Sequence, residues 1–190
     1  MGGGLAGDPR HPRGGGVLFR NDGVPNSSPD GRPGAVPRFT DVTAEAGLSG
    51  RDGYGLAAVA SDLNGDGRPD LYLSVDFQGD DRLLLNNGDG TFSDAARQAT
   101  GHTSRFSMGV DAADADDDGR PDVFVADMMP EREDVLKSSA ATETFTLFNL
   151  RLRAGYHPQY ARNTLQRNLG PAAGAAGALP NGTALPRFAE

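Results

Sequence analysis

Residues 62–70 read D-L-N-G-D-G-R-P-D, and residues 114–122 read D-A-D-D-D-G-R-P-D. The two stretches lie 52 positions apart and are identical at their first, fifth, sixth, seventh, eighth and ninth positions. At the third position an asparagine is replaced by an aspartate, which also offers a side-chain oxygen. Because the same spacing of acidic residues and glycine occurs twice in the same phase, we interpret the chain as an internal repeat.

Side-chain oxygens at alternate positions are typical of a loop that coils around a hard cation. Calcium binds about 6–8 oxygen atoms at about 2.3–2.6 Å, and glycine at the sixth position permits the sharp turn that this needs. The arginine at the seventh position is expected to contribute only its main-chain oxygen and to point its charge outward. The sequence therefore predicts two Ca²⁺ sites, with the ligand residues Asp62, Asn64, Asp66, Arg68 and Asp70, and Asp114, Asp116, Asp118, Arg120 and Asp122.

Other interpretations of the two loops stay open. Asp and Gly also occur together in turns that hold no ion, although closely spaced carboxylates repel one another without a cation. Magnesium is a weaker candidate because it resists a cage built wholly of protein ligands. An EF-hand has Glu at the twelfth position, where this chain has Leu73 or Val125. A dockerin-type module needs a helix after the loop, whereas the alternation of Leu71, Leu73 and Val75 predicts a strand.

A second pattern occurs three times and predicts hairpins beside the aspartate loops. In residues 84–94, Asn-Asn-Gly-Asp-Gly separates leucines from Thr-Phe-Ser-Asp, which is a hairpin signal. Longer versions with inserted residues occupy 18–41 and 165–189. Hairpins of the two kinds alternate along the chain, as they do in the four-stranded blades of a β-propeller. We therefore expect an all-β fold, a partial β-propeller of about two and a half four-stranded blades with a helical insertion.

The order of these motifs predicts how the chain is organised. The expected units are a disordered N-terminal segment (1–16), a closing half-blade and linker (17–54), a complete blade with its calcium loop (55–106) and a second blade with its calcium loop (107–190). The second blade is expected to hold a helical insertion at about 131–155, whose apolar face (Phe145, Phe148 and Leu152) would pack against the sheet edge or, in the alternative, face a ligand. The insert at 24–37 and the Ala/Gly-rich loop at 171–186 are interpreted as flexible surface loops.

Several of these residues resemble a known family. The nine-residue loops, the N-G-D-G-T-F turn at 87–92 and the segment F-T-D-V-T-A-E-A-G-L at 39–48 resemble FG-GAP/VCBS repeats. Residues 107–111, 127–130 and 160–166 are similar to the cartilage-acidic-protein-like (ASPIC/UnbV-associated) branch. The resemblance covers roughly residues 17–170. It implies a calcium-binding, integrin-α-like propeller, usually extracytoplasmic, that acts in adhesion or in protein or carbohydrate binding. It also implies that the chain is a fragment, because family propellers have more blades.

Composition excludes several classes of function. Lys and Arg number 18 against 26 Asp and Glu, a net charge of −8, which does not suit a nucleic-acid partner. The absence of cysteine excludes disulfides, zinc-thiolate sites and thiol nucleophiles. No apolar run reaches the roughly 20 residues of a membrane helix, and the first residues do not form a signal peptide. Either the protein stays inside the cell or its true N-terminus lies upstream of this Met, and of the two we expect an extracellular, cell-surface or periplasmic location.

The sequence does not contain the motifs of common enzyme classes. Its histidines, His11, His102 and His157, lie outside any H-E-x-x-H motif, and neither a G-x-S-x-G elbow nor a P-loop is present. We therefore expect a non-enzymatic module that binds a protein or carbohydrate ligand. The alternatives are a non-catalytic propeller portion of a polysaccharide-active enzyme and a dockerin-type calcium module. An aromatic and basic cluster is interpreted as a packed sheet edge or as a sugar-binding surface: Tyr156, His157, Tyr160 and Arg162.

Overall fold

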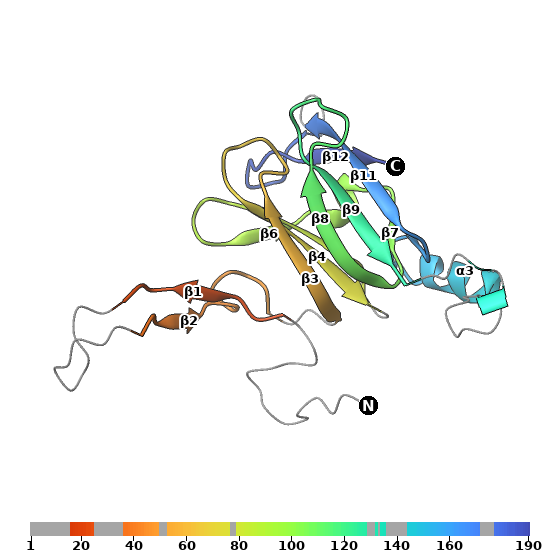
Figure 1. The fold of residues 1–190 in the computed structure, drawn as a ribbon, viewed down its shortest axis with the longest axis horizontal. Coiled ribbons are helices and arrows are strands. Elements are labelled where there is room, and N and C mark those ends of the chain that lie inside the picture. The colour runs from red at the N-terminus through yellow and green to blue at the C-terminus, as the bar shows by residue number, and fades with distance from the viewer. Residues whose placement is uncertain are drawn as a thin grey trace, which may run out of the picture.

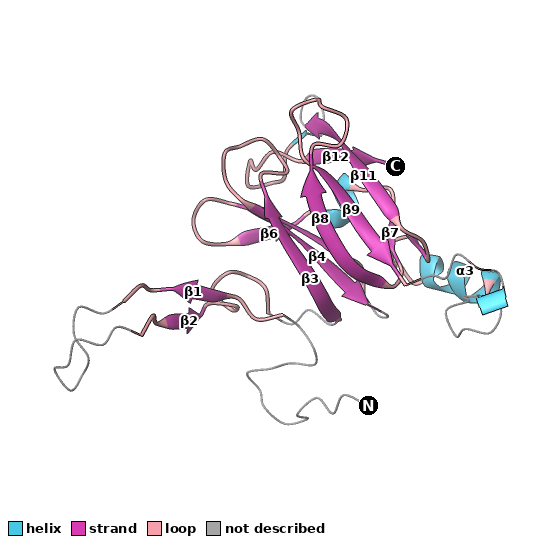
Figure 2. Cartoon of the chain, viewed as in Figure 1, coloured by secondary structure: helices cyan, strands magenta, loops and turns pink. Residues whose placement is uncertain are grey.

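The computed structural model describes residues 16–24, 36–49, 53–76, 79–128, 132, 134–135, 144–171 and 177–190. Strands dominate this part of the chain, and helices are few and short (Figure 2). The expectation of a mainly β-sheet protein is therefore confirmed. The described strands form no closed barrel, and the number of propeller blades stays a prediction.

The first four-stranded sheet is built from consecutive strands, each antiparallel to the next. The aspartate loop at 62–69 joins its first two strands, and the Asn-Gly turn joins its last two. The strands, in spatial and chain order, are β3 (Tyr54–Ser61), β4 (Asp70–Asp76), β5 (Arg82–Asn86) and β6 (Phe92–Asp94). A short helix, α1 (Ala96–Ala99), follows the last strand.

The second four-stranded sheet has the same arrangement. Its strands are, in spatial order, β8 (Ser107–Ala113), β9 (Asp122–Asp127), β11 (Thr164–Pro171) and β12 (Pro186–Ala189). The longest connection lies between β9 and β11 and contains the helix α3 (Phe145–Arg153), which lies at the side of the sheets in Figure 1. Beyond α3, β10 (Gln159–Tyr160) pairs in parallel with β7 (Thr103–Ser104).

The N-terminal residues form a separate hairpin next to the first sheet (Figure 1). It consists of β1 (Phe19–Asn21) and β2 (Phe39–Asp41), which pair antiparallel. The segment after β2 reaches the first sheet, where the Phe92 N–H donates to the Ala46 carbonyl oxygen at 3.1 Å. Residues 25–35, most of the predicted insert at 24–37, lie outside the described residues, as do residues 1–15 of the predicted N-terminal segment.

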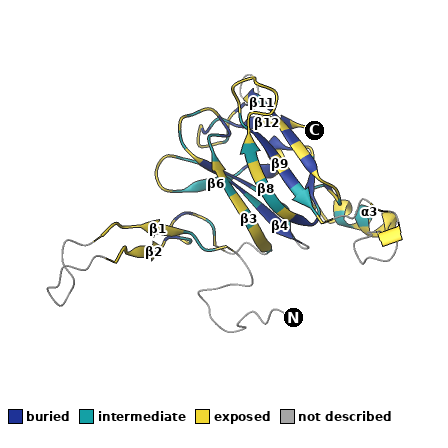
Figure 3. Cartoon of the chain, viewed as in Figure 1, coloured by how far each residue is buried: buried dark blue, intermediate teal, exposed yellow. Residues whose placement is uncertain are grey.

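The hydrophobic core lies between the two four-stranded sheets. Tyr72 on β4 and Leu83 on β5 are register partners, so they share one face of the first sheet, and both are at most 1% exposed. They belong to one buried cluster with Val123 and Val125 of β9 and Phe188 of β12. Along β11 and β12 buried residues alternate with more exposed ones (Figure 3), as expected for strands packed on one face, whereas Leu83, Leu84 and Leu85 of β5 are all fully buried.

The outer face of the second sheet has the same side-chain pattern but is exposed. Phe124 lies 52 positions after Tyr72, and its register partner is Leu165, just as Leu83 is the partner of Tyr72. Phe124 is 45% exposed and Leu165 is 44% exposed. The repeat therefore presents the same aromatic–leucine pair twice, and only the first pair is covered by a neighbouring sheet within the described residues.

Helix α3 falls within the predicted insertion, but Phe145 is 81% exposed, and only Phe148 of the predicted apolar face stacks on an aromatic ring, that of Tyr160.

The interpretation of 171–186 as a flexible surface loop was wrong for its described part. Residues 177–185 form a turn closed by an Ala178–Ala184 bridge, and two of its leucines reach the core, since Leu185 is buried in the core cluster and Leu179 packs against that cluster.

Asp81 is a buried carboxylate at the start of β5. It is 1% exposed and accepts hydrogen bonds from the Val75 N–H at 2.9 Å and from the Tyr72 hydroxyl at 3.1 Å. Burial raises the pKa of Asp81 to about 7, against the opposing effect of these hydrogen bonds. The carboxyl group therefore titrates near neutral pH while it holds β4 against β5.

Matched substitutions test the assignment of the core. We expect Leu83→Ala to lower the free energy of unfolding by about 2–5 kcal/mol, because it opens a cavity between the sheets. Leu165→Ala changes the equivalent leucine on the exposed face and should cost less than about 1 kcal/mol. Urea unfolding followed by circular dichroism measures both. Equal losses would show that the two faces are buried alike.

Asp81→Asn tests the pH dependence. The folded-state pKa of about 7 lies above the ordinary value of 3.8, so folding favours the protonated carboxyl. That contribution is complete below about pH 4 and is lost as the pH rises through about 7. We expect the stability of the wild type, relative to Asp81→Asn, to fall over this range in urea unfolding experiments. Parallel stability–pH profiles for the two proteins would contradict the assignment.

Candidate metal centre

The first aspartate loop coils around the carboxylate of its first residue. Asp62 Oδ1 accepts from the N–H groups of Gly65 at 2.8 Å and Asp66 at 3.0 Å, and its Oδ2 accepts from the Gly67 N–H at 2.9 Å. Gly67 has φ +84°, a conformation that side chains with a Cβ rarely adopt. The predicted sharp turn is therefore present, and strand β4 begins at Asp70 directly after it.

The second loop repeats this conformation. Asp114 Oδ1 accepts from the Asp118 N–H at 3.0 Å, and Asp114 Oδ2 accepts from the Gly119 N–H at 2.8 Å. Gly119 has φ +83°. Strand β9 begins at Asp122, so a strand directly follows each loop, as the alternating pattern predicted. A dockerin-type module requires a helix at this point, so the backbone does not favour that alternative.

The ninth residue of each loop is a buried carboxylate that joins two parts of the sheet. Asp70 Oδ2 accepts from the Leu63 N–H at 3.0 Å within the loop, and Asp70 Oδ1 accepts from the Asn86 N–H on β5 at 2.8 Å. Burial, with the nearby charges of Asp66 and Asp62, raises the pKa of Asp70 to about 6 despite these hydrogen bonds. A bound cation would oppose this effect.

Asp122 has the same role in the second loop. Its Oδ2 accepts from the Ala115 N–H at 3.0 Å, and its Oδ1 accepts from the Asn168 N–H on β11 at 2.7 Å. Asp122 is 1% exposed. Each ninth-position carboxylate thus holds its loop against the neighbouring outer strand.

Three predicted ligands of the second loop converge. Carboxylate oxygens of Asp114, Asp116 and Asp122 all lie within 4.8 Å of one another. In the first loop the residue that corresponds to Asp116 is Asn64, whose side-chain amide donates to Asp66 Oδ2 at 2.8 Å and to the Ala184 carbonyl at 3.3 Å. The donors of both loops are hard oxygens, which fit a calcium ion better than a softer metal.

The arginines at the seventh position depart from the prediction. Each guanidinium, expected to point outward, turns back toward its own loop and pairs with the position-five carboxylate (Asp66 or Asp118). The Nε of Arg68 also donates to the Asn86 carbonyl at 3.1 Å, and the Nε of Arg120 donates to the corresponding carbonyl of Asn168 at 3.0 Å. The outward expectation was wrong because both acceptors lie within reach of the side chain.

Asn86 and Asn168 are supporting residues that the sequence analysis did not assign to the site. Asn86 Nδ2 donates to the Pro69 carbonyl at 3.1 Å. Asn168 Nδ2 donates to the Pro121 carbonyl at 3.1 Å and also to the Leu63 carbonyl in the first loop at 2.9 Å. The available signal was the repeated Asn-x-Gly in the outer turns, which we interpreted only as a hairpin signal.

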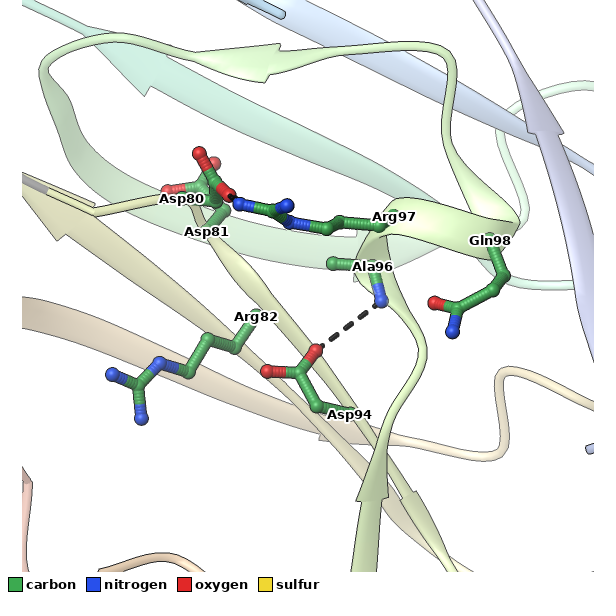
Figure 4. Close-up of a pocket in the computed structure, with 7 residues that line it drawn as sticks. All are labelled: Asp80, Asp81, Arg82, Asp94, Ala96, Arg97 and Gln98. Atoms are coloured by element: carbon green, nitrogen blue, oxygen red, sulfur yellow. Dashed lines mark hydrogen bonds and ion pairs between the residues drawn. The ribbon is translucent and has the colours of Figure 1, made fainter. Parts of the chain in front are cut away.

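A separate hollow lies beside β5 and α1. It has a volume of about 470 Å³ and is lined by acidic and basic residues. In Figure 4 the Arg97 guanidinium is directed at Asp80, with an N–O distance of 2.7 Å, and the Asp94 carboxylate is directed at the Ala96 nitrogen. Arg97 thus pairs with Asp80, and Asp94 accepts from the main chain, so these side chains are engaged within the protein.

The predicted aromatic and basic cluster packs mainly against side chains from neighbouring segments. The Tyr160 ring contacts His102 edge-on at 5.0 Å between centroids, and the Arg162 guanidinium lies 5.5 Å from the same ring. His157 Nε2 lies 3.2 Å from the Thr100 hydroxyl. These contacts favour the interpretation as a packed sheet edge.

Comparison with known proteins finds one family model that is similar to part of the chain. Residues 62–125 match the family model described as an FG-GAP-like repeat. The match runs from the first residue of the first aspartate loop into strand β9, so it includes both loops. No curated protein matches the chain. No helix among the described residues has the length and apolar character needed to span a membrane.

Two substitutions in the second loop separate structural from cation-binding roles. In the presence of chelator, Asp122→Ala leaves the buried Asn168 N–H and the partly buried Ala115 N–H without their acceptor, and we expect a loss of about 2–5 kcal/mol in the free energy of unfolding. Asp116 is exposed, so Asp116→Ala should change this value by less than about 0.5 kcal/mol. Urea unfolding in chelator measures both. Similar losses would contradict the anchoring role of Asp122.

Proposed function

We propose that the chain is a calcium-binding FG-GAP/VCBS repeat module of an integrin-α-like propeller, with one Ca²⁺ in each aspartate loop. Its function would be non-catalytic binding of a protein or carbohydrate ligand outside the cell, at the cell surface or in the periplasm. The cation is structural in this proposal, because it orders loops that connect the strands of a sheet. The repeat match at 62–125 supports this class of module.

The observation that carries the proposal is the convergence of Asp114, Asp116 and Asp122 within 4.8 Å. Carboxylates this close repel one another unless a cation lies between them. Their loop follows the same path as the first loop, since a first-position aspartate accepts backbone N–H groups in each. The backbone path of the loop is thus repeated, as it would be in a dedicated ion-binding loop.

The environment expected for such sites supports an extracytoplasmic location. Calcium modules of extracellular proteins bind at about 10⁻⁴–10⁻³ M, a range that matches a calcium-rich exterior and not a cytosol. The acidic composition, with a net charge of −8, is compatible with cation binding and does not favour a polyanionic partner.

Thermal unfolding with calcium or with chelator tests the proposal. We expect calcium at about 100 times its Kd to stabilise the protein by about 2.7 kcal/mol for each site. Asp116→Ala and Asp118→Ala should each remove part of this gain. Magnesium at the same concentration should stabilise less, because it prefers to keep its water ligands. Differential scanning calorimetry measures each effect.

The control for this experiment is Asp134→Ala, which removes an exposed aspartate outside both loops. It should leave the calcium-induced rise in Tm unchanged. A Tm that is the same in calcium and in chelator would refute calcium binding by this chain.

A further inference from the structure

The two position-seven arginines make the same pair of contacts, in loops 52 residues apart. In each loop the guanidinium pairs with the position-five carboxylate, while Nε donates to a main-chain carbonyl of the outer turn. Both side chains are partly shielded, with 40% of Arg68 and 44% of Arg120 exposed. A chance surface ion pair would not be expected to recur with both partners preserved.

The outer turns provide space for these arginines. A Cβ at Gly88 would lie 3.3 Å from Arg68 Nε, and one at Gly170 would lie 3.5 Å from Arg120 Cδ. Both glycines are two residues after the asparagine whose carbonyl accepts the Nε hydrogen bond. The Asn-x-Gly turn and the arginine therefore form a matched pair, repeated once in each sheet.

The arginine also changes the charge at the metal centre. Three carboxylates of the second loop converge, those of Asp114, Asp116 and Asp122. The Asp118 carboxylate is not part of this group and forms an ion pair with Arg120. A second guanidinium is close as well, with Arg167 Nε 3.7 Å from Asp116 Oδ2. Positive side chains thus already neutralise part of the negative charge that would attract a cation.

We propose that Arg68 and Arg120 are internal counter-ions that limit the calcium affinity of the two loops. In the cation-free protein each guanidinium neutralises the position-five carboxylate and holds the loop against the outer turn. A cation that engages this carboxylate must share it with the guanidinium, so part of the binding energy is offset. The inference rests on the proposed calcium binding and adds the groups that set its strength.

The test compares calcium binding by the wild type and by the double variant Arg68→Met/Arg120→Met, using isothermal titration calorimetry on the full chain. Methionine keeps an unbranched apolar side chain but removes the charge. We expect a Kd for calcium about three- to tenfold lower than that of the wild type, because two repelling charges are lost. In chelator the same variant should melt at a lower temperature, since it lacks the guanidinium contacts that hold each loop against its outer turn.

Two further variants separate charge from folding. Arg68→Lys/Arg120→Lys keeps the positive charge but loses the planar guanidinium group with its several N–H donors. Its Kd should therefore stay near the wild-type value, while its Tm in chelator falls. It also provides a charge-retaining protein if the methionine variant does not fold, and a Kd several-fold lower for this lysine variant would overturn the proposal. Arg132→Met removes an arginine that pairs with Asp134 outside the loops, and its Kd should be unchanged.

The outcomes distinguish this inference from the proposed function. If the wild type binds no calcium, the proposed function fails, and the counter-ion role fails with it. If the wild type binds calcium and the methionine variant binds with equal or weaker affinity, calcium binding stands and the counter-ion role alone is overturned. Tighter binding by the Arg132→Met control would also overturn it, because the effect would then be one of net charge.

Discussion

The structure depends on the buried carboxylates at the ninth position of each aspartate loop. Asp70 and Asp122 each accept one N–H from their own loop and one from the neighbouring outer strand. An N–H that is shielded from water and lacks an acceptor is costly, and all four of these hydrogen bonds are buried or partly buried, so they fix where each loop lies on its sheet. The same residues end the loop and begin a strand, which links the geometry of the candidate metal centre directly to the strand pairing.

Repetition explains how the two sheets fit together. Each sheet presents an aromatic residue and a leucine on one face, Tyr72 with Leu83 and Phe124 with Leu165. The first pair is buried against β9, while the second remains exposed. Asn168 adds a polar link across the interface, because its side-chain amide donates to the Leu63 carbonyl in the first loop. The position of the second sheet is therefore coupled to the path of the first loop.

Arginine side chains, as well as the carboxylates, carry charge at the candidate metal centre. Both loops contain an arginine that pairs with a carboxylate of the same loop, and the second has Arg167 nearby. The asparagines of the outer turns hold these arginines through main-chain carbonyls. Occupancy of the site and the position of the outer hairpin would thus depend on the same side chains, which is consistent with a structural role for the cation.

The sequence by itself determined the strands of the two four-stranded sheets, the aspartate loops and the internal repeat, because each depends on short-range features: alternating side chains, glycine at a positive φ and carboxylates two residues apart. Only the tertiary structure decided that Arg68 and Arg120 turn back, since their carbonyl partners lie 18 and 48 residues away along the chain. It also decided that Leu185 is buried and Phe124 is exposed. Burial and long-range hydrogen bonds depend on which surface lies opposite, and no local pattern encodes that surface.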